Sequence, residues 1–186
     1  LVQKGARPII YDGNDKLDPE DILAKIKDAG ETQVILGELP EAVLNTLDLV
    51  VMSPGVPLDL PIVKKMREKN IPIWGEIELA FQSGKGTLLA ITGTNGKTTT
   101  TALLGEIIKA YYPETYVVGN IGIPYTDIVS DQTEKSVTAA EISSFQLETI
   151  DTFHPKVSAI TNITEDHLNR HHTMEEYIRV KEQIAS

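Results

Sequence analysis

Cysteine is absent from the 186-residue sequence, which excludes disulfide bonds, thiolate zinc sites, iron–sulfur clusters and cysteine nucleophiles. Basic residues are scarce, since 17 lysines and arginines stand against 27 aspartates and glutamates, for a formal net charge of -10. A surface that binds nucleic acid or an anionic membrane needs a basic patch, so we expect neither partner. An anionic small ligand needs only a local pocket and is not excluded by this charge.

Long apolar runs are also missing, because no stretch approaches the roughly 20 residues that a membrane-spanning helix needs. No signal peptide, internal repeat or low-complexity tract is visible. The composition, 41% hydrophobic and 24% charged, is typical of a globular protein. The length fits one large domain or two modest ones. The first residue is Leu1 rather than Met, so the sequence is compatible with an internal piece of a longer protein.

Short β-branched runs alternate with stretches of helical pattern along the chain. We expect strands at residues 7–11, 33–36, 47–52, 71–74, 87–92, 115–118, 136–141 and 157–161. We expect helices at residues 19–29, 61–69, 76–82, from the end of a Gly-rich loop to about 110, and at 173–186. Strands that alternate with helices indicate βαβ units and parallel sheets.

The sequence therefore predicts an α/β fold of two parallel-sheet domains, at residues 1–84 and 86–186, with segment 83–86 as a hinge or linker. We expect the first to be a truncated Rossmann-like domain, because the chain enters at the end of a helical pattern with no strand before it. We expect the second to be a partial P-loop ATPase-type domain, because the chain stops within a helical pattern.

The sharpest motif is Ile-Thr-Gly-Thr-Asn-Gly-Lys-Thr at residues 91–98, which follows a buried-type strand and opens a helix. That order is the setting of a phosphate-binding loop, although Ile91 replaces the usual first glycine. Glycines let the backbone direct N–H groups at phosphate oxygens, and the helix N-terminus favours an anion. Lys97 would reach the β- and γ-phosphates, and the Thr98 hydroxyl would bind Mg²⁺. The alternative is an ordinary Gly-rich turn between a strand and a helix.

Two further candidates follow predicted strands, and ligands of open parallel sheets bind beyond the carboxyl ends of strands. Glu141 is a candidate Mg²⁺ ligand, or else a solvated glutamate at a strand end. His167 could bind a metal through a neutral ring nitrogen, or else form hydrogen bonds within a loop. His171 and His172 resemble a zinc cluster with it only loosely, because no ligand from a third element is evident.

Lys181 lies within the apolar face of the last predicted helix. That face consists of Met174, Tyr177, Ile178, Val180, Ile184 and Ala185. A lysine that faces the core should have a lowered pKa or a dedicated partner, and a neutral amine can react with CO₂ to give a carbamate that binds metals. The alternative is a lysine at the edge of the apolar face with its ammonium group in water.

Three glycine- or serine-containing turns follow predicted strands. Residues 119–122, Gly-Asn-Ile-Gly, allow a close approach of the backbone, and Asn120 could hydrogen-bond a ligand. Asp12 and Gly13 follow the first predicted strand and Ser53 follows the third, and we expect both turns at strand ends of one sheet. The alternative for all three is an ordinary turn, which these residue types favour.

These motifs together resemble the Mur ligase family, in its order and with similar spacing, over nearly the whole chain. The resemblance rests on residues 93–98, 119–122, 141–148, 162–167 and 173–181. Ser-Ser-Phe-Gln-Leu-Glu at 143–148 resembles the family branch that adds D-glutamate, since ligases of neighbouring steps and folylpolyglutamate synthase carry other residues there. Asn169 is a departure, because Asp more often follows His-Leu in the family.

The resemblance implies an ATP-dependent amide ligase that works with two Mg²⁺ ions. The ATP-binding residues would be Gly93, Thr94, Asn95, Gly96, Lys97, Thr98 and Thr99. The metal ligands would be Thr98, Glu141, His167 and Lys181, with Lys181 carbamylated, and the catalytic residues Lys97, His167 and Lys181. The substrate-binding residues would be Asp12, Gly13, Ser53, Asn120 and Ser143.

The implied substrates are ATP, UDP-N-acetylmuramoyl-L-alanine and D-glutamate, joined through an acyl phosphate in the synthesis of peptidoglycan precursors. A monomeric, cytoplasmic enzyme of three domains is expected, with a Gly-rich loop before Leu1 and most of the D-glutamate site after Ser186. We therefore expect the 186-residue chain alone to be inactive. Two alternatives remain. One is another ligase of this class, either a folylpolyglutamate synthase or the ligase of the next step, and the other is a nucleotide-binding module without enzymatic activity.

Overall fold

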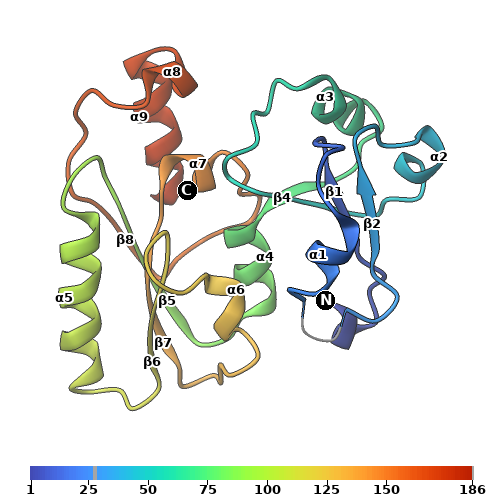
Figure 1. Ribbon diagram of the computed structural model, residues 1–186. Coiled ribbons are helices and arrows are strands. Elements are labelled where there is room, and N and C mark those ends of the chain that lie inside the picture. The colour runs from blue at the N-terminus through green and yellow to red at the C-terminus, as the bar shows by residue number, and fades with distance from the viewer. Residues whose placement is uncertain (27–28, 186) are drawn as a thin grey trace. The chain divides into compact units, whose positions relative to one another are not determined.

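The computed structural model describes residues 1–26 and 29–185 (Figure 1). The chain forms two compact units, Leu1–Asp48 with Pro61–Ile71, and Leu49–Leu60 with Pro72–Ser186. Every strand pair in the described residues is parallel, which confirms the predicted α/β class with parallel sheets. None of the helices within residues 1–26 and 29–185 has the length and hydrophobicity needed to cross a bilayer.

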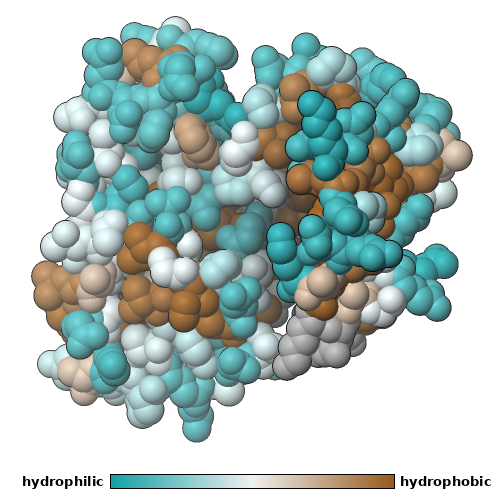
Figure 2. All heavy atoms as spheres, in the orientation of Figure 1, coloured by the Kyte–Doolittle hydropathy of each residue, from teal (hydrophilic) through white to brown (hydrophobic). Residues whose placement is uncertain are grey.

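The first unit is built around one parallel strand pair. Its elements are the 3₁₀ helix η1 (Val2–Lys4), β1 (Ile9–Asp12), α1 (Pro19–Leu23), β2 (Gln33–Leu36), α2 (Glu41–Leu44) and α3 (Pro61–Glu68). β1 pairs with β2 from Ile9 opposite Gln33 to Asp12 opposite Leu36. The apolar side chains of these two strands are only half-buried, and Figure 2 shows hydrophobic surface over them.

Helix α1 begins as predicted but ends early. The Asp18 carboxylate accepts a hydrogen bond from the Glu20 N–H at 2.9 Å, and Pro19 occupies the first turn, where it is favoured. After Leu23 the backbone tightens, because Lys25 and Ile26 each donate to the carbonyl three residues back. The predicted helix to residue 29 is therefore too long, and residues 27 and 28 of that prediction lie outside the described residues.

The second unit contains a four-stranded parallel sheet in the order β6-β7-β5-β8. The strands are β5 (Thr87–Thr92), β6 (Thr115–Gly119), β7 (Val137–Glu141) and β8 (Val157–Ile160). The helices are α4 (Glu76–Ser83), α5 (Lys97–Lys109), α6 (Tyr125–Ile128), α7 (Ser144–Leu147), α8 (Leu168–His171) and α9 (Met174–Glu182), followed by the 3₁₀ helix η2 (Gln183–Ala185). β3 (Val50–Met52) and β4 (Ile73–Gly75) form a separate parallel pair in this unit.

Helices cover both faces of the central sheet, and this explains why β7 is buried along its whole length. Val137 and Ala139 of β7 pack with Ile108 of α5 on one face. On the other face, Ala140 belongs to a larger core with residues from α4, α6, α7, α9 and η2 (Figure 1). Since successive side chains of a strand point to opposite faces, both faces of β7 require small or apolar residues.

A buried carboxylate connects α4 to the loop before β8. Glu78 is fully buried and accepts hydrogen bonds from the backbone N–H groups of Asp151 at 2.9 Å, Thr152 at 3.1 Å and Phe153 at 2.9 Å. Burial alone would raise the pKa of Glu78, but these bonds, with those from Gln82 and the Thr152 hydroxyl, bring the pKa below its ordinary value.

The structure differs from several of the boundaries that the sequence predicts. The last helix is capped by Thr173, which accepts from the Glu176 N–H at 3.1 Å, and it becomes a 3₁₀ helix after Glu182. Ser186, the end of the predicted helix, lies outside the described residues. Segment 83–86, predicted as a hinge, is held inside the second unit, since the Lys85 N–H donates to Gln132 Oε1 at 3.1 Å. The domain division between residues 84 and 86 stays a prediction.

Candidate functional site

Four chain segments meet at one edge of the central sheet in the second unit. β5, β6, β7 and β8 run parallel, so the segments that follow them leave the sheet at the same edge. These segments are the Gly-rich loop before α5, the turn with Asn120, the end of β7 at Glu141 and the loop that leads to His167. Open parallel sheets bind ligands at this edge, and these predicted site residues lie along it, while their binding roles stay predictions.

The Gly-rich loop has the backbone of a phosphate-binding loop. Gly93 and Gly96 have backbone φ angles of +147° and +80°, which are positive values that favour glycine. Gly96 caps α5 without a side-chain hydrogen bond, so the helix N-terminus carries the favourable partial charge for an anion. The Lys97 ammonium group folds over the loop and donates to the carbonyl oxygens of Gly93 and Thr94, both at 2.9 Å.

Residues that follow β8 hold the loop in this shape. The Thr94 N–H donates to the Asn162 carbonyl at 2.9 Å, and the Asn95 N–H donates to Asn162 Oδ1 at 2.9 Å. The Asn95 carbonyl accepts from Thr161 Oγ1 at 2.7 Å, and the Thr164 N–H donates to Thr94 Oγ1 at 3.0 Å. These reciprocal bonds make the loop and the segment after β8 one rigid structure.

Glu141, Thr98 and Asn120 form the second part of the site. Glu141 is 1% exposed, which rules out the alternative of a solvated strand-end glutamate. Its Oε2 accepts from Thr98 Oγ1 at 2.8 Å, and its Oε1 accepts from Asn120 Nδ2 at 2.9 Å. A hydroxyl and a carboxylate oxygen side by side are hard oxygen donors that suit Mg²⁺, which usually takes one or two carboxylates together with water and phosphate oxygens.

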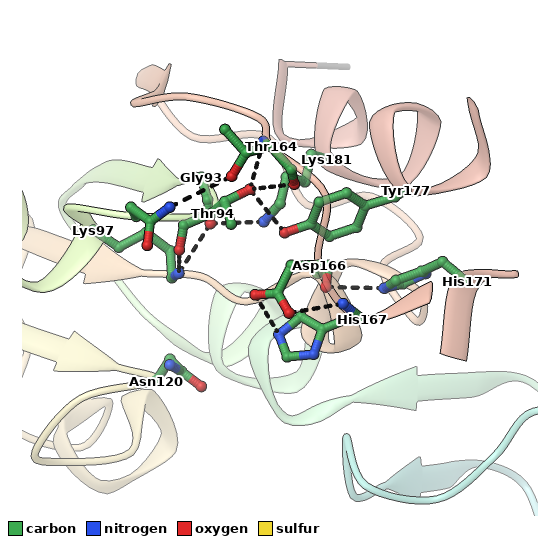
Figure 3. Close-up of polar contacts among 12 residues, drawn as sticks. Gly93, Thr94, Lys97, Asn120, Thr164, Asp166, His167, His171, Tyr177 and Lys181 are labelled. Atoms are coloured by element: carbon green, nitrogen blue, oxygen red, sulfur yellow. Dashed lines mark hydrogen bonds and ion pairs between the residues drawn. The ribbon is translucent and has the colours of Figure 1, made fainter. Parts of the chain in front are cut away.

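Lys181 faces the core, which is one of the two alternatives that the helical pattern leaves open. It is 1% exposed, so the alternative of a solvated ammonium group is wrong. Its Nζ donates to the Gly93 carbonyl at 2.8 Å and lies 4.8 Å from the centre of the Tyr177 ring (Figure 3). Burial and the charge of Lys97 lower the pKa of Lys181 to about 8, although Asp166 acts in the opposite direction. The amine is therefore neutral far more readily than an ordinary lysine.

His167 starts α8 with a positive φ of 51 and is half-exposed. Its Nε2 lies 3.5 Å from Asp166 Oδ2 (Figure 3). Its ring packs against Phe145 with 5.0 Å between the ring centres. Within residues 1–26 and 29–185, no three His, Asp or Glu side chains come together as a metal site, so no histidine zinc cluster is found there. His167 as a metal ligand stays a prediction.

The predicted substrate contacts divide between the two units. Ser143 caps α7, since its Oγ accepts from the Gln146 N–H at 3.2 Å. Asp12 belongs to the first unit, where it accepts from the Asn14 N–H at 2.8 Å and forms a turn with Gly13. Ser53 follows β3 in the second unit, so the expectation that Asp12 and Ser53 end strands of one sheet is wrong. β1 pairs with β2, and β3 pairs with β4.

The sequence did not predict the polar contacts of two residues at the site, Tyr177 and His171. Tyr177 was assigned to an apolar face, but its hydroxyl lies 3.1 Å from Thr94 Oγ1. His171 is buried, with Nε2 3.0 Å from Ser144 Oγ and Nδ1 3.4 Å from Glu148 Oε1. Burial lowers the pKa of His171, although Glu148 opposes the change. The contact of Tyr177 could have been expected, because a tyrosine on the apolar face of a helix usually has a hydrogen-bond partner for its buried hydroxyl group.

Comparisons with known proteins agree with this geometry. The Mur ligase middle domain family matches residues 91–186, and the family of MurD-like N-terminal domains of Mur ligases matches residues 1–75. The UDP-N-acetylmuramoylalanine--D-glutamate ligase of Lachnospira eligens is 59% identical over 185 residues, which is 100% of this chain and 41% of that protein.

Enzymes of the same name from two other bacteria are similarly close. That of Lachnoclostridium phytofermentans is 56% identical over 100% of this chain and 41% of the relative. That of Clostridioides difficile is 54% identical over 99% of this chain and 41% of the relative. The chain thus spans about two fifths of the length of the relatives that it matches, 41% in each case.

Proposed function

From the premise that this chain belongs to the Mur ligase family, we propose that the whole protein is an ATP-dependent ligase that adds D-glutamate to UDP-N-acetylmuramoyl-L-alanine. The names of the relatives, which are 54% to 59% identical over nearly the whole chain, support this choice of substrates. The observation that carries the proposal is the convergence of Lys97 and Lys181 on the Gly93 carbonyl. Lys97 brings positive charge to the phosphate loop, which suits chemistry between anions, and Lys181 beside it is the lysine that would be carbamylated.

The reaction requires two anions to meet. The alanine carboxylate of the substrate attacks the γ-phosphorus of ATP, which releases ADP and gives an acyl phosphate. The amine of D-glutamate then attacks the acyl carbon, loses a proton and expels phosphate to form the amide. Lys97 would leave the loop carbonyls and offset the charge of the transferring phosphoryl group, while the N-terminus of α5 holds the phosphates.

The proposed reaction uses magnesium, because the Thr98 hydroxyl and the Glu141 carboxylate are oxygen ligands of the kind that Mg²⁺ prefers. These two residues would hold one Mg²⁺, and His167 with a carbamylated Lys181 would hold a second. The bound ions would neutralise phosphate charge during the transfer. Asn120 donates to Glu141 and would keep that carboxylate in place. We further propose that the whole protein is monomeric and cytoplasmic. It would act in the synthesis of peptidoglycan precursors and so contribute to cell shape and cell division.

The carbamate would form from the neutral amine of Lys181, which the lowered pKa of about 8 makes easier to reach than in an ordinary lysine. The amine would add to the carbon of CO₂ and lose one proton, which gives two oxygens for a metal. Activity of Lys181→Ala should then be partly restored by short-chain carboxylates. A variant that is not rescued, together with full activity of the wild type in CO₂-free buffer, would count against the carbamate.

The test of the function uses the full-length protein that contains this chain. Phosphate release from ATP with UDP-N-acetylmuramoyl-L-alanine should require D-glutamate, and Lys97→Ala should lower it by roughly a thousandfold. Lys109→Ala is the matched control, because Lys109 is an exposed lysine at the other end of α5. Turnover with a different amino acid or with a folate would indicate another ligase of the class. ATP binding without acceptor-dependent phosphate release would indicate a non-enzymatic module.

A further inference from the structure

An almost buried ion pair joins α8 to the end of α7. Arg170 donates from Nε to both oxygens of Glu148, at 3.2 and 3.1 Å, and from Nη2 to Oε2 at 2.6 Å. The two side chains are only 15% and 11% exposed. A guanidinium that engages a carboxylate through two nitrogens is fixed in direction as well as in place.

The same guanidinium reaches the turn after β3. Arg170 Nη2 also donates to the Val56 carbonyl at 2.9 Å. The Val56 N–H in turn donates to the Ser53 carbonyl at 3.0 Å, which closes the turn that begins at Ser53. One side chain thus connects Glu148 with the turn that carries a predicted contact of the UDP-linked substrate.

Glu148 is also connected to the start of α7 and, through α7, to His167. His171 lies 3.4 Å from Glu148 Oε1 and 3.0 Å from Ser144 Oγ, in the first turn of α7. The ring of Phe145 lies between Arg170, at 5.3 Å, and His167, at 5.0 Å. The pair therefore sits where the Ser53 turn, the α7 segment and the His167 loop come together.

We propose that Arg170 is a positioning residue for the UDP-linked substrate, because it holds the Ser53 turn in register with α7 through its bonds to Val56 and Glu148. This inference rests on the proposed function, in which Ser53 and Ser143 contact that substrate. The phosphate loop is held instead by residues 161–164 and by Tyr177. Loss of the Arg170 bonds should consequently weaken binding of the UDP-linked substrate and leave binding of ATP unchanged.

The test is Arg170→Lys in the full-length ligase. Lysine keeps the charge but cannot make the fork and the bond to Val56 together. The KM for UDP-N-acetylmuramoyl-L-alanine should rise about tenfold, while the KM for ATP stays within about twofold. The matched control is Arg179→Lys on α9, because Arg179 also binds a glutamate through two nitrogens, at 2.8 and 2.6 Å, but in solvent. The control should leave all the constants unchanged.

The inference is overturned if Arg170→Lys raises both KM values equally, lowers only kcat, or behaves as Arg179→Lys does. If Arg170→Lys fails to fold, the double variant Glu148→Gln with Arg170→Gln removes both charges together. The same two KM values, measured for this double variant, then test the role of Arg170. Calorimetric binding of UDP-N-acetylmuramoyl-L-alanine separates this inference from the function. A wild type without D-glutamate-dependent phosphate release would overturn the function, whereas a Kd unchanged by Arg170→Lys would overturn only the role of Arg170.

Discussion

Two buried charges of opposite sign are accommodated by backbone groups. The Lys181 ammonium group donates to the Gly93 carbonyl, and the Glu78 carboxylate accepts from the N–H groups of residues 151–153. Among residues 1–26 and 29–185, neither group has an oppositely charged side chain within hydrogen-bond distance. Buried charges need such compensation, because desolvation otherwise favours their neutral forms.

Removal of the charge of Lys97 should raise the pKa of Lys181. That pKa is lowered to about 8 by burial and by Lys97, so in Lys97→Met we expect a shift toward the ordinary lysine value. Fewer positive neighbours favour the protonated amine, which then keeps its proton to higher pH. NMR titration of labelled lysine side chains measures this, with Lys181→Met to identify the signal. Ordinary pKa values for all the lysines of the wild type would contradict the prediction.

Glu78→Gln should destabilise the protein by about 2 to 4 kcal/mol, because an amide NH₂ would face backbone donors. The pKa of Glu78 is lowered in the folded state, so its stabilisation is present above the pKa of the unfolded chain. It is lost as the pH falls through the lower folded value, and the difference between wild type and variant should shrink in acid. Urea unfolding at neutral and acidic pH measures both effects. The exposed Glu134→Gln serves as control, and equal effects of the two changes would refute the assignment.

Residue positions were predictable where a periodic pattern fixed them. The place of Lys181 within the apolar face of its helix followed from the helical period, and the place of Glu141 followed from the end of a parallel strand, whereas the burial of each was one of two open alternatives. The contacts of His171 with Ser144 and Glu148 did not follow from any pattern. Such partners come from different elements, and only the folded chain determines which hydrogen bonds they form.

At the level of elements, α5 lies unusually close to β6. A methyl group on Gly105 of α5 would collide with a methyl group of Val117 on the strand. Glycine in the middle of a helix costs about 1 kcal/mol relative to alanine, so its presence here indicates that the contact outweighs propensity. The close approach packs the middle of α5 against β6.

Gly105→Ala should therefore destabilise the protein, despite the better helix propensity of alanine. Overpacking costs about 1 to 3 kcal/mol, and the gain in propensity offsets about 1 kcal/mol of that. In a Val117→Ala background the collision is absent, and Gly105→Ala should become neutral or stabilising. Thermal unfolding of the four proteins of this cycle measures the coupling. Stabilisation by Gly105→Ala in the wild-type background would show that the helix can move away from the strand.

The strands were predictable from their short β-branched runs, and the longer helices from several repeats of the helical period. The strand predictions at 33–36 and 87–92 coincide with β2 and β5. The helices α2, α6, α7 and α8 were not predicted, since a helix of four residues forms a single turn and shows no period. Of these four helices, α7 has a side-chain cap from Ser143, whereas α2, α6 and α8 have none and each bury a residue against neighbouring elements.

For the whole molecule, each compact unit is built from two segments that are not consecutive along the chain. Leu49–Leu60 and the segment from Pro72 onward belong to the second unit. Strand β4 leads directly into α4, whose Ile77 and Ala80 lie in the core of the central sheet. Sequence periodicity identifies strands but does not say against which compact unit a short strand pair packs, and the predicted division between residues 84 and 86 stays a prediction.

The 186-residue chain alone should not release phosphate in response to D-glutamate. It spans 41% of the length of its relatives, and most of the D-glutamate site is expected in the remainder. The measurement compares the purified chain with the full-length protein under the same conditions, with retained circular dichroism as the sign that the chain is folded. D-glutamate-dependent turnover by the chain would place the complete site within these residues.

The hydrogen bonds of the Gly-rich loop have one more consequence. The carbonyl oxygens of Gly93, Thr94 and Asn95 each accept from a side chain, and two of these three oxygens accept from an ammonium group. An approaching triphosphate would therefore meet a Gly-rich loop whose carbonyl oxygens have their negative partial charge compensated, at Asn95 by Thr161 and Asn162 and, until Lys97 turns to the phosphate, at Gly93 and Thr94 by Lys97. Repulsion between phosphate and peptide oxygens is thereby lowered during the approach.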